Sequence, residues 1–170
     1  IRGYQLTLDR DLERYKSDLN LLLSRQTSLH EKRLTIIDEM YKKLVQLDST
    51  MRAMTGIHVV VEDGEKEQQE RVNKAQEAFA DYNNYFLFHK LYFNKATSEL
   101  LESIRKEYFS ANWDFFELKR MQSFTGGQLS KEGFKESYTK VQDASKRIRE
   151  DIPKTLEILE DEFRKLLGVT

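Results

Sequence analysis

The sequence predicts an all-α protein whose long helices pack side by side as an elongated antiparallel bundle or coiled coil. Apolar residues recur every three or four positions over most of the 170 residues, which is the spacing of one helix face. One proline and seven glycines leave few points at which helices are interrupted. We expect a single helical domain over residues 1–170, with an extended arm at 1–29 and a bundle body at 30–170.

The first expected helix covers residues 7–54, and most of its apolar positions step alternately by four and three. Before residue 30 the apolar stripe is narrow, as in a helix that packs against one partner helix. After residue 33 the stripe widens, which indicates two neighbouring helices. The residues that widen it are Leu34, Ile37, Tyr41 and Val45.

The second expected stretch covers residues 65–121 and contains a break. Apolar residues crowd every face at FHKLYF, and Asn94 is a suitable cap for a new helix that begins at Lys95. We therefore predict a kink or one non-helical turn near residues 90–94. Gly126 and Gly127 indicate a turn before the next stretch.

The third expected stretch covers residues 130–167. Pro153 lies inside its apolar pattern, and the helix should kink or restart there because proline lacks a backbone N–H and clashes with the preceding turn. Gly168 is a natural C-cap. We expect the first and third stretches to pack antiparallel, with the kinked second stretch covering them.

Composition argues against several functions. Lysine and arginine number 28 and aspartate and glutamate 29, so the basic excess typical of a duplex-DNA-binding protein is absent. Without cysteine there are no disulfides, thiolate zinc sites or iron–sulfur clusters. No run of 18 apolar residues occurs, so we expect no membrane-spanning helix in this chain. The chain begins at Ile1 and not at methionine, so we expect a fragment or a trimmed chain.

The histidines do not form a metal motif. A di-iron bundle uses Glu-x-x-His, but no glutamate lies three residues before His30, His58 or His89. The stretch HEKRL lacks the second histidine of a zinc-protease helix, because residue 34 is leucine. Glycine-rich phosphate-binding loops are also absent. We therefore expect no bound metal, no cofactor and no enzymatic activity.

Twelve of the nineteen aromatic residues lie between Phe79 and Phe116. Helical spacing favours a core in which the kinked second stretch meets the wide face of the first. The alternative is a ligand pocket, or a surface on which single-stranded nucleic acid stacks. The candidate aromatic cluster consists of Tyr85, Phe88, Tyr92, Phe93 and Trp113.

The narrow stripe of the arm is a candidate interface. Left in water, it would be a long apolar surface that is unusual on a soluble monomer. We expect a second copy of the chain to cover it in a parallel or antiparallel homodimer, with Gln26 and Arg33 as the polar positions that select one alignment. The candidate interface residues are Leu8, Leu12, Tyr15, Leu19 and Leu22.

Three segments carry a resemblance to a known group of proteins. They are LHEKRLTIIDEMYKKLVQL at 29–47, NNYFLFHKLYFNKATSELL at 83–101 and LEDEFRKLLGV at 159–169. The first contains Leu-His-x-Lys-Arg followed by Ile and Tyr-x-x-Leu-Val, and the second ends its aromatic run in Tyr-Phe before a polar cap. The chain resembles small bacterial membrane-anchored helical proteins of uncharacterised function, which share these three elements.

The resemblance implies a place in the bacterial cytoplasm, tethered to the inner membrane by a segment upstream of this chain. It identifies no catalytic residue. Together with the apolar pattern, it favours a scaffold or protein-interaction domain, with another protein partner besides a second copy. The alternative is a ligand-sensing or single-stranded nucleic-acid-binding bundle that uses the aromatic residues of 79–116.

Overall fold

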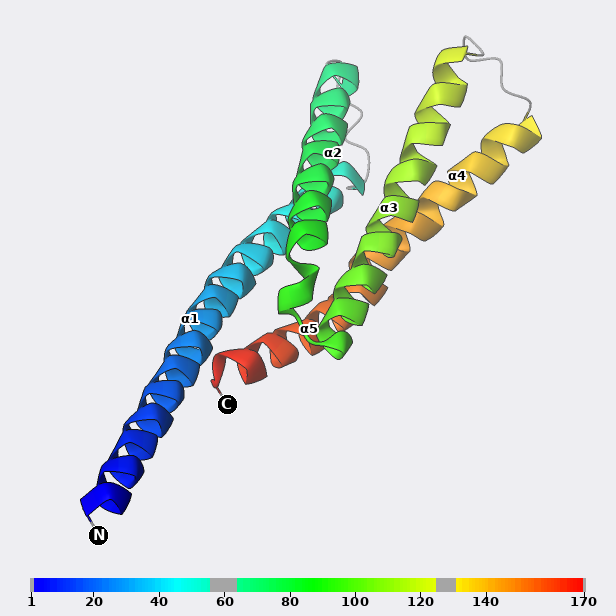
Figure 1. Cartoon of the computed structure of the whole chain (residues 1–170). Coiled ribbons are helices and arrows are strands. Elements are labelled where there is room, and N and C mark those ends of the chain that lie inside the picture. The colour runs from blue at the N-terminus through cyan, green and yellow to red at the C-terminus, as the bar shows by residue number, and fades with distance from the viewer. Residues whose placement is uncertain (1, 56–63, 125–130, 170) are drawn as a thin grey trace. The chain divides into compact units, whose positions relative to one another are not determined.

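The fold is all-α, as predicted. The computed structural model describes residues 2–55, 64–124 and 131–169, and in these ranges it contains helices and no strand. The helices are α1 (Arg2–Thr55), α2 (Gly64–His89), α3 (Lys95–Phe124), α4 (Lys131–Lys146) and α5 (Ile152–Leu167), with a 3₁₀ turn η1 (Lys90–Tyr92) and a π turn η2 (Arg147–Asp151) between them (Figure 1). The turn predicted at Gly126–Gly127 lies outside the described residues.

The chain divides into two compact units, Ile1–Ile37 and Asp38–Thr170. The first unit is one helix, formed by the N-terminal part of α1. The second unit holds the rest of α1 together with α2 to α5. The arm predicted at residues 1–29 lies within the first unit.

The predicted break near residues 90–94 is confirmed. α2 ends at His89, η1 follows, and Phe93 has extended backbone. The side-chain Oδ1 of Asn94 then accepts a hydrogen bond of 2.8 Å from the backbone N–H of Thr97, and this bond caps the first turn of α3. The break separates α2 from α3 within the second unit (Figure 1).

The predicted interruption at Pro153 is also confirmed, and it takes the form of a π turn. The N–H of Ile152 bonds to the carbonyl of Arg147, five residues back, and α5 restarts with Pro153 in its first turn. This widened turn comes just before the proline, where a regular helix would meet the clash of its ring. Gly168 caps α5 at φ 70°, a left-handed conformation that glycine adopts without steric cost.

The core of the second unit draws on all five helices. In α1 the buried positions follow one face of the helix, and in α3 they recur every three or four residues. The fully or nearly fully buried side chains include Met40, Leu44, Leu47, Met51, Tyr82, Phe86, Leu101, Ile104, Tyr108, Ala144, Ile148 and Leu159.

Two buried tyrosine hydroxyls inside the second unit are paired across helices. The Tyr82 hydroxyl donates to the carbonyl of Leu101 at 2.8 Å, and the Tyr108 hydroxyl donates to Oδ1 of Asp48 at the same distance. Burial raises the pKa of both tyrosines, so they stay protonated donors at neutral pH. These bonds satisfy hydroxyls that would otherwise destabilise the core.

The C-terminal end of α1 is fastened to the α4–η2 segment. The carbonyl of Thr55 accepts hydrogen bonds from Oγ of Ser145 at 3.3 Å and from Nη2 of Arg149 at 3.1 Å. A cation at this position also complements the negative end of the helix dipole. The end of α1 is therefore satisfied by side chains of the second unit.

Candidate interaction surfaces

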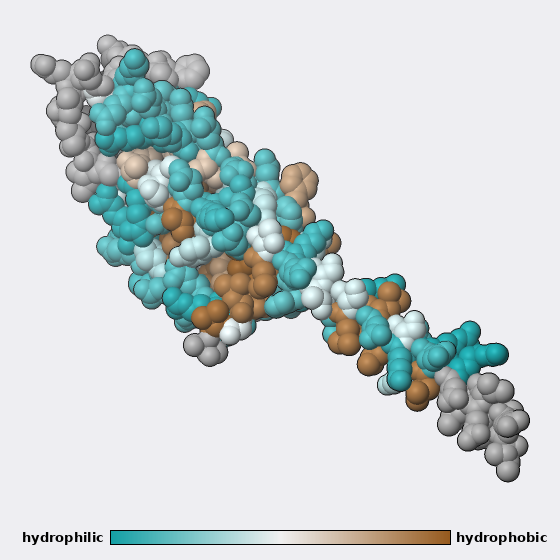
Figure 2. All heavy atoms as spheres, turned by 90° about the vertical axis from the view of Figure 1, so that its left-hand side faces the viewer, coloured by the Kyte–Doolittle hydropathy of each residue, from teal (hydrophilic) through white to brown (hydrophobic). Residues whose placement is uncertain are grey.

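The first unit presents an exposed apolar face. We call it the N-terminal stripe; its members are Leu12, Tyr15, Leu19, Leu22 and Leu29. These side chains are 44–67% exposed, and Figure 2 shows apolar patches along this unit. Four of them belong to the predicted interface, whereas the side chain of Leu8 lies outside the described residues. Leu21 and Leu23 beside the stripe are exposed too.

The polar positions that interrupt the spacing of the stripe are exposed as well. Gln26 and Arg33 stand where an apolar residue would continue the alternation of three and four. A polar residue at such a position weakens a helix pair but restricts the alignments it can adopt. The face is therefore an apolar strip with fixed polar interruptions along a single helix.

A second exposed strip lies on α3. Phe109, Trp113 and Phe116 follow one another at spacings of four and three and are each about half exposed. Their rings are in contact, with centroids 6.5 Å apart for the first pair and 6.0 Å for the second. Phe79 of α2 extends the row, 6.0 Å from Phe109. We call these four residues the α3 aromatic row.

The five aromatic residues predicted as a cluster lie in different surroundings. Tyr85 stacks on His89 with ring centroids 4.1 Å apart, and the ring centroid of Tyr92 lies 6.3 Å from that of the same imidazole. Phe93 is buried and packs against Phe163 of α5. Phe88 is 82% exposed.

Trp113 belongs to the α3 aromatic row. It lies 18 positions after Lys95, the first residue of α3, and is therefore about 27 Å along the helix from the end that follows Tyr92 and Phe93 in the sequence. The spacing of Phe109, Trp113 and Phe116 was visible in the sequence, but the predicted set took only the tryptophan from it. Because the same spacing is typical of a core face, it did not distinguish an exposed row from a buried one.

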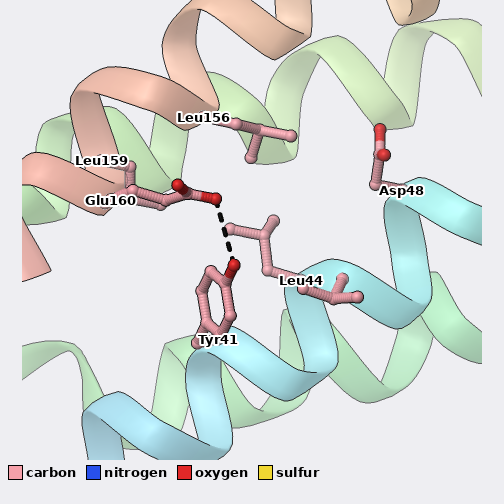
Figure 3. Close-up of a pocket in the computed structure, with 7 residues that line it drawn as sticks. Tyr41, Leu44, Asp48, Leu156, Leu159 and Glu160 are labelled. Carbon is pink, nitrogen blue, oxygen red and sulfur yellow. Dashed lines mark hydrogen bonds between the residues drawn. The ribbon is translucent and has the colours of Figure 1, made fainter.

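A small groove lies between α1 and α5 in the second unit (Figure 3). Its volume is about 120 Å³, and Leu44, Leu156 and Leu159 supply apolar walls. The Tyr41 hydroxyl donates to Oε1 of Glu160 at 3.1 Å across it. This hydrogen bond and burial raise the pKa of Tyr41, so the phenol is held protonated and tied to its carboxylate partner.

An ionic contact joins α3 to η2. Arg147 lies 3.4 Å from Oε2 of Glu107 and 3.2 Å from Oδ2 of Asp114, and it also donates to the Ser110 hydroxyl. Burial raises the pKa of Asp114, although the guanidinium acts in the opposite direction. The groups pair with one another between two helices, which is the pattern of a structural contact.

The described residues provide neither a metal-binding cluster nor a membrane-spanning helix. Among the side chains that the structure describes, no three His, Cys, Asp or Glu residues gather closely enough to hold a metal ion. Within the described ranges, each helix lacks the combination of length and apolarity that crossing a bilayer requires.

No protein-family model, curated protein or solved structure matches this chain.

Proposed function

We propose that the chain is a scaffold or protein-interaction domain that associates with a second copy of itself through the N-terminal stripe. The observation that carries the proposal is the exposure of five large apolar side chains along one helical face of the first unit. Alternating steps of four and three are typical of a helix that pairs with another helix.

The energetics favour covering this face. Fully burying one large apolar side chain contributes about 1.5–3 kcal/mol as an upper bound, and side chains that are already half covered gain about half of that. A symmetric pair covers ten such side chains. The sum, about 7.5–15 kcal/mol, offsets the association cost of about 4–15 kcal/mol. Micromolar dimerisation needs a surplus of about 8 kcal/mol, which this sum supplies when the stripe is fully covered and the association cost lies near its lower end.

A non-catalytic role is part of the proposal. The polar groups that meet between helices pair with partners inside the chain, as Tyr108 does with Asp48 and Tyr41 with Glu160. Such pairs hold helices together, and the raised pKa of Tyr108 and of Tyr41 keeps both phenols protonated near neutral pH. Nothing in the described residues points to a reaction.

The cellular setting is proposed from the sequence resemblance alone. A segment upstream of this chain would anchor the domain at the bacterial inner membrane, and the helices would reach other proteins from there. The reading frame upstream of residue 1, and fractionation of its full-length product between membrane and soluble fractions, test this part of the proposal. A full-length product found only in the soluble fraction would remove the anchor.

Light scattering coupled to size exclusion, at protein concentrations from about 1 to 100 μM, tests the self-association. The double substitution Leu19→Glu and Leu22→Glu places four carboxylates in the interface and should leave a monomer. Leu87→Glu with Leu91→Glu is the matched control, because both leucines are exposed outside the stripe. A wild-type chain that stays monomeric throughout, or a control that dissociates as fully as the stripe variant, contradicts the proposal.

The α3 aromatic row favours a second candidate, the binding of an aromatic ligand or single-stranded nucleic acid. Half-exposed rings in a row can stack on bases. Trp113 is the sole tryptophan of the sequence, so its fluorescence reports directly on this surface. Quenching by an oligothymidylate that weakens as salt is raised would support this candidate, whereas unchanged fluorescence would exclude stacking on Trp113.

A further inference from the structure

The charges beside the N-terminal stripe are arranged asymmetrically. In heptad terms, Leu12 and Leu19 occupy a positions and Leu22 and Leu29 occupy d positions. The flanking g positions carry opposite charges within one helix, and these charges decide how two copies can align. They are Asp18 and Arg25.

Both charged side chains are exposed and available to a partner. In the part of the chain that the structure describes, neither Asp18 nor Arg25 forms an ion pair or hydrogen bond through its side chain. Arg25 follows Asp18 by seven residues, which is one heptad, so the two side chains lie on the same face of the helix.

Building on the proposed function, we infer that the second copy pairs antiparallel, with Leu19 facing the partner's Leu22. In this alignment the residue numbers of facing core positions add up to 41. Leu12 then faces the partner's Leu29, and two-fold symmetry repeats both contacts, so four leucine–leucine layers result. Gln26 faces the partner's Tyr15, whose hydroxyl can bond to the amide.

The ion pairs select this alignment. In an antiparallel helix pair g positions face g positions, and here Asp18 comes opposite the partner's Arg25. Symmetry gives two such pairs. Interhelical pairs of this kind are the contacts that set the orientation of helices in coiled coils.

Neighbouring alignments are less favourable. A shift by one heptad in one direction places Asp18 opposite the partner's Asp18, with Arg25 opposite the partner's Asp11. A shift in the other direction places Arg25 opposite the partner's Arg25, with Asp18 opposite the partner's Lys32. Each shifted alignment therefore contains a like-charged pair.

A parallel pair places Asp18 opposite the partner's Leu23 and Arg25 opposite the partner's His30. It also places Arg33 against itself in the core. Only the inferred alignment gives both charged groups a partner of opposite sign.

Cysteine cross-linking tests the orientation. Because the sequence has no native cysteine, only the introduced thiols can form a disulfide. Leu12→Cys and Leu29→Cys are made separately in the full chain, mixed, and oxidised. We expect a mixed disulfide and little self-cross-linking, because either cysteine would lie about 25 Å along the helix from its own copy, whereas a disulfide needs Cα atoms within about 7 Å.

The outcomes separate this inference from the proposed function. Self-cross-linking of Leu12→Cys would show a parallel pair and overturn the antiparallel orientation while leaving self-association intact. A dimer in which Leu12→Cys links to Leu22→Cys in place of Leu29→Cys would overturn the alignment. A chain that is monomeric by light scattering before oxidation would overturn the proposed function itself.

Charge reversal supplies an independent test. Asp18→Arg and Arg25→Asp should each weaken the homodimer about tenfold at low salt, because each turns two attractive contacts into repulsive ones. An equimolar mixture of the two variants should form a heterodimer, since every facing pair is then complementary. Glu13→Arg is the matched control at a position away from the pairing face. Variants that dimerise as the wild type does, or a mixture that stays monomeric, would overturn the alignment.

Discussion

Two stretches of α1 share one apolar spacing and differ completely in exposure. Along the N-terminal stripe the apolar side chains are 44–67% exposed, whereas Met40, Leu44, Leu47, Met51 and Met54 are 0–2% exposed. The second stretch meets α2, α3 and α5 through Lys43, Asp48 and Tyr41. The difference teaches that an apolar period identifies the face a helix will bury but not the molecule that covers it.

The largest effect that tests this comparison comes from truncating one leucine in each stretch. Leu44→Ala removes a nearly fully buried side chain and should lower the free energy of unfolding by about 2–5 kcal/mol. Leu12→Ala, at a half-exposed site, should change it by less than about 0.5 kcal/mol in the monomer. Urea denaturation at submicromolar protein, where self-association is weak, measures both. Equal losses at the two sites would contradict the comparison.

A smaller loss is expected from the hydroxyl that ties α3 to the covered stretch. Tyr108→Phe removes the hydrogen bond to Asp48 and should cost about 1.5–3 kcal/mol, the range for a bond to a charged group. Tyr15→Phe is the control at an exposed tyrosine of the N-terminal stripe and should be nearly neutral at submicromolar protein, where self-association is weak. Thermal unfolding followed by circular dichroism compares them. A neutral Tyr108→Phe would mean that packing alone holds α3 against α1.

The cap of α3 should contribute less again. Asn94→Ala removes the bond to the N–H of Thr97 and should cost about 1 kcal/mol. Asn84→Ala, at an exposed position inside α2, removes the same side chain without removing a cap. Hydrogen exchange should show the loss of protection in α3 and not along the N-terminal stripe. Loss of protection in both stretches would mean that they unfold as one unit.

The smallest effect concerns the ion pair between Glu102 and Arg105 on the surface of α3. Hydrogen bonds from Arg105 lower the pKa of Glu102 below its ordinary value of 4.5. The folded state therefore gains stability from this group above that pH and loses it as pH falls through the lowered pKa. Glu102→Gln should cost a few tenths of a kcal/mol at pH 7, because the pair is partly exposed.

Urea denaturation at pH 7 and pH 3 measures this dependence. The gap between wild type and Glu102→Gln should narrow at pH 3, and Glu70→Gln serves as a charge-matched control on α2. A gap that widens on acidification would reverse the assigned direction. A cost near that of Leu44→Ala would mean that this partly exposed ion pair stabilises the second unit as much as a buried leucine does.

The sequence by itself determined the helices and their interruptions, because these depend on groups within a few residues of each other. Asn94 caps α3 through a neighbour three residues away, and Gly168 ends α5 through its own backbone freedom. Pro153 predicted an interruption for the same local reason. Its form, a π turn closed between Ile152 and Arg147, was not predicted, because proline excludes a regular turn without selecting the alternative.

Only the tertiary structure decided which apolar faces are covered and which aromatic residues meet. Phe93 packs on Phe163, 70 residues along the chain, while Trp113 joins a half-exposed row that starts at Phe79. Tyr41 finds its partner at Glu160. Such contacts depend on how whole helices lie against one another, and the spacing of residues within one helix carries no record of that. The N-terminal stripe therefore has the spacing of a core face, although its side chains are 44–67% exposed.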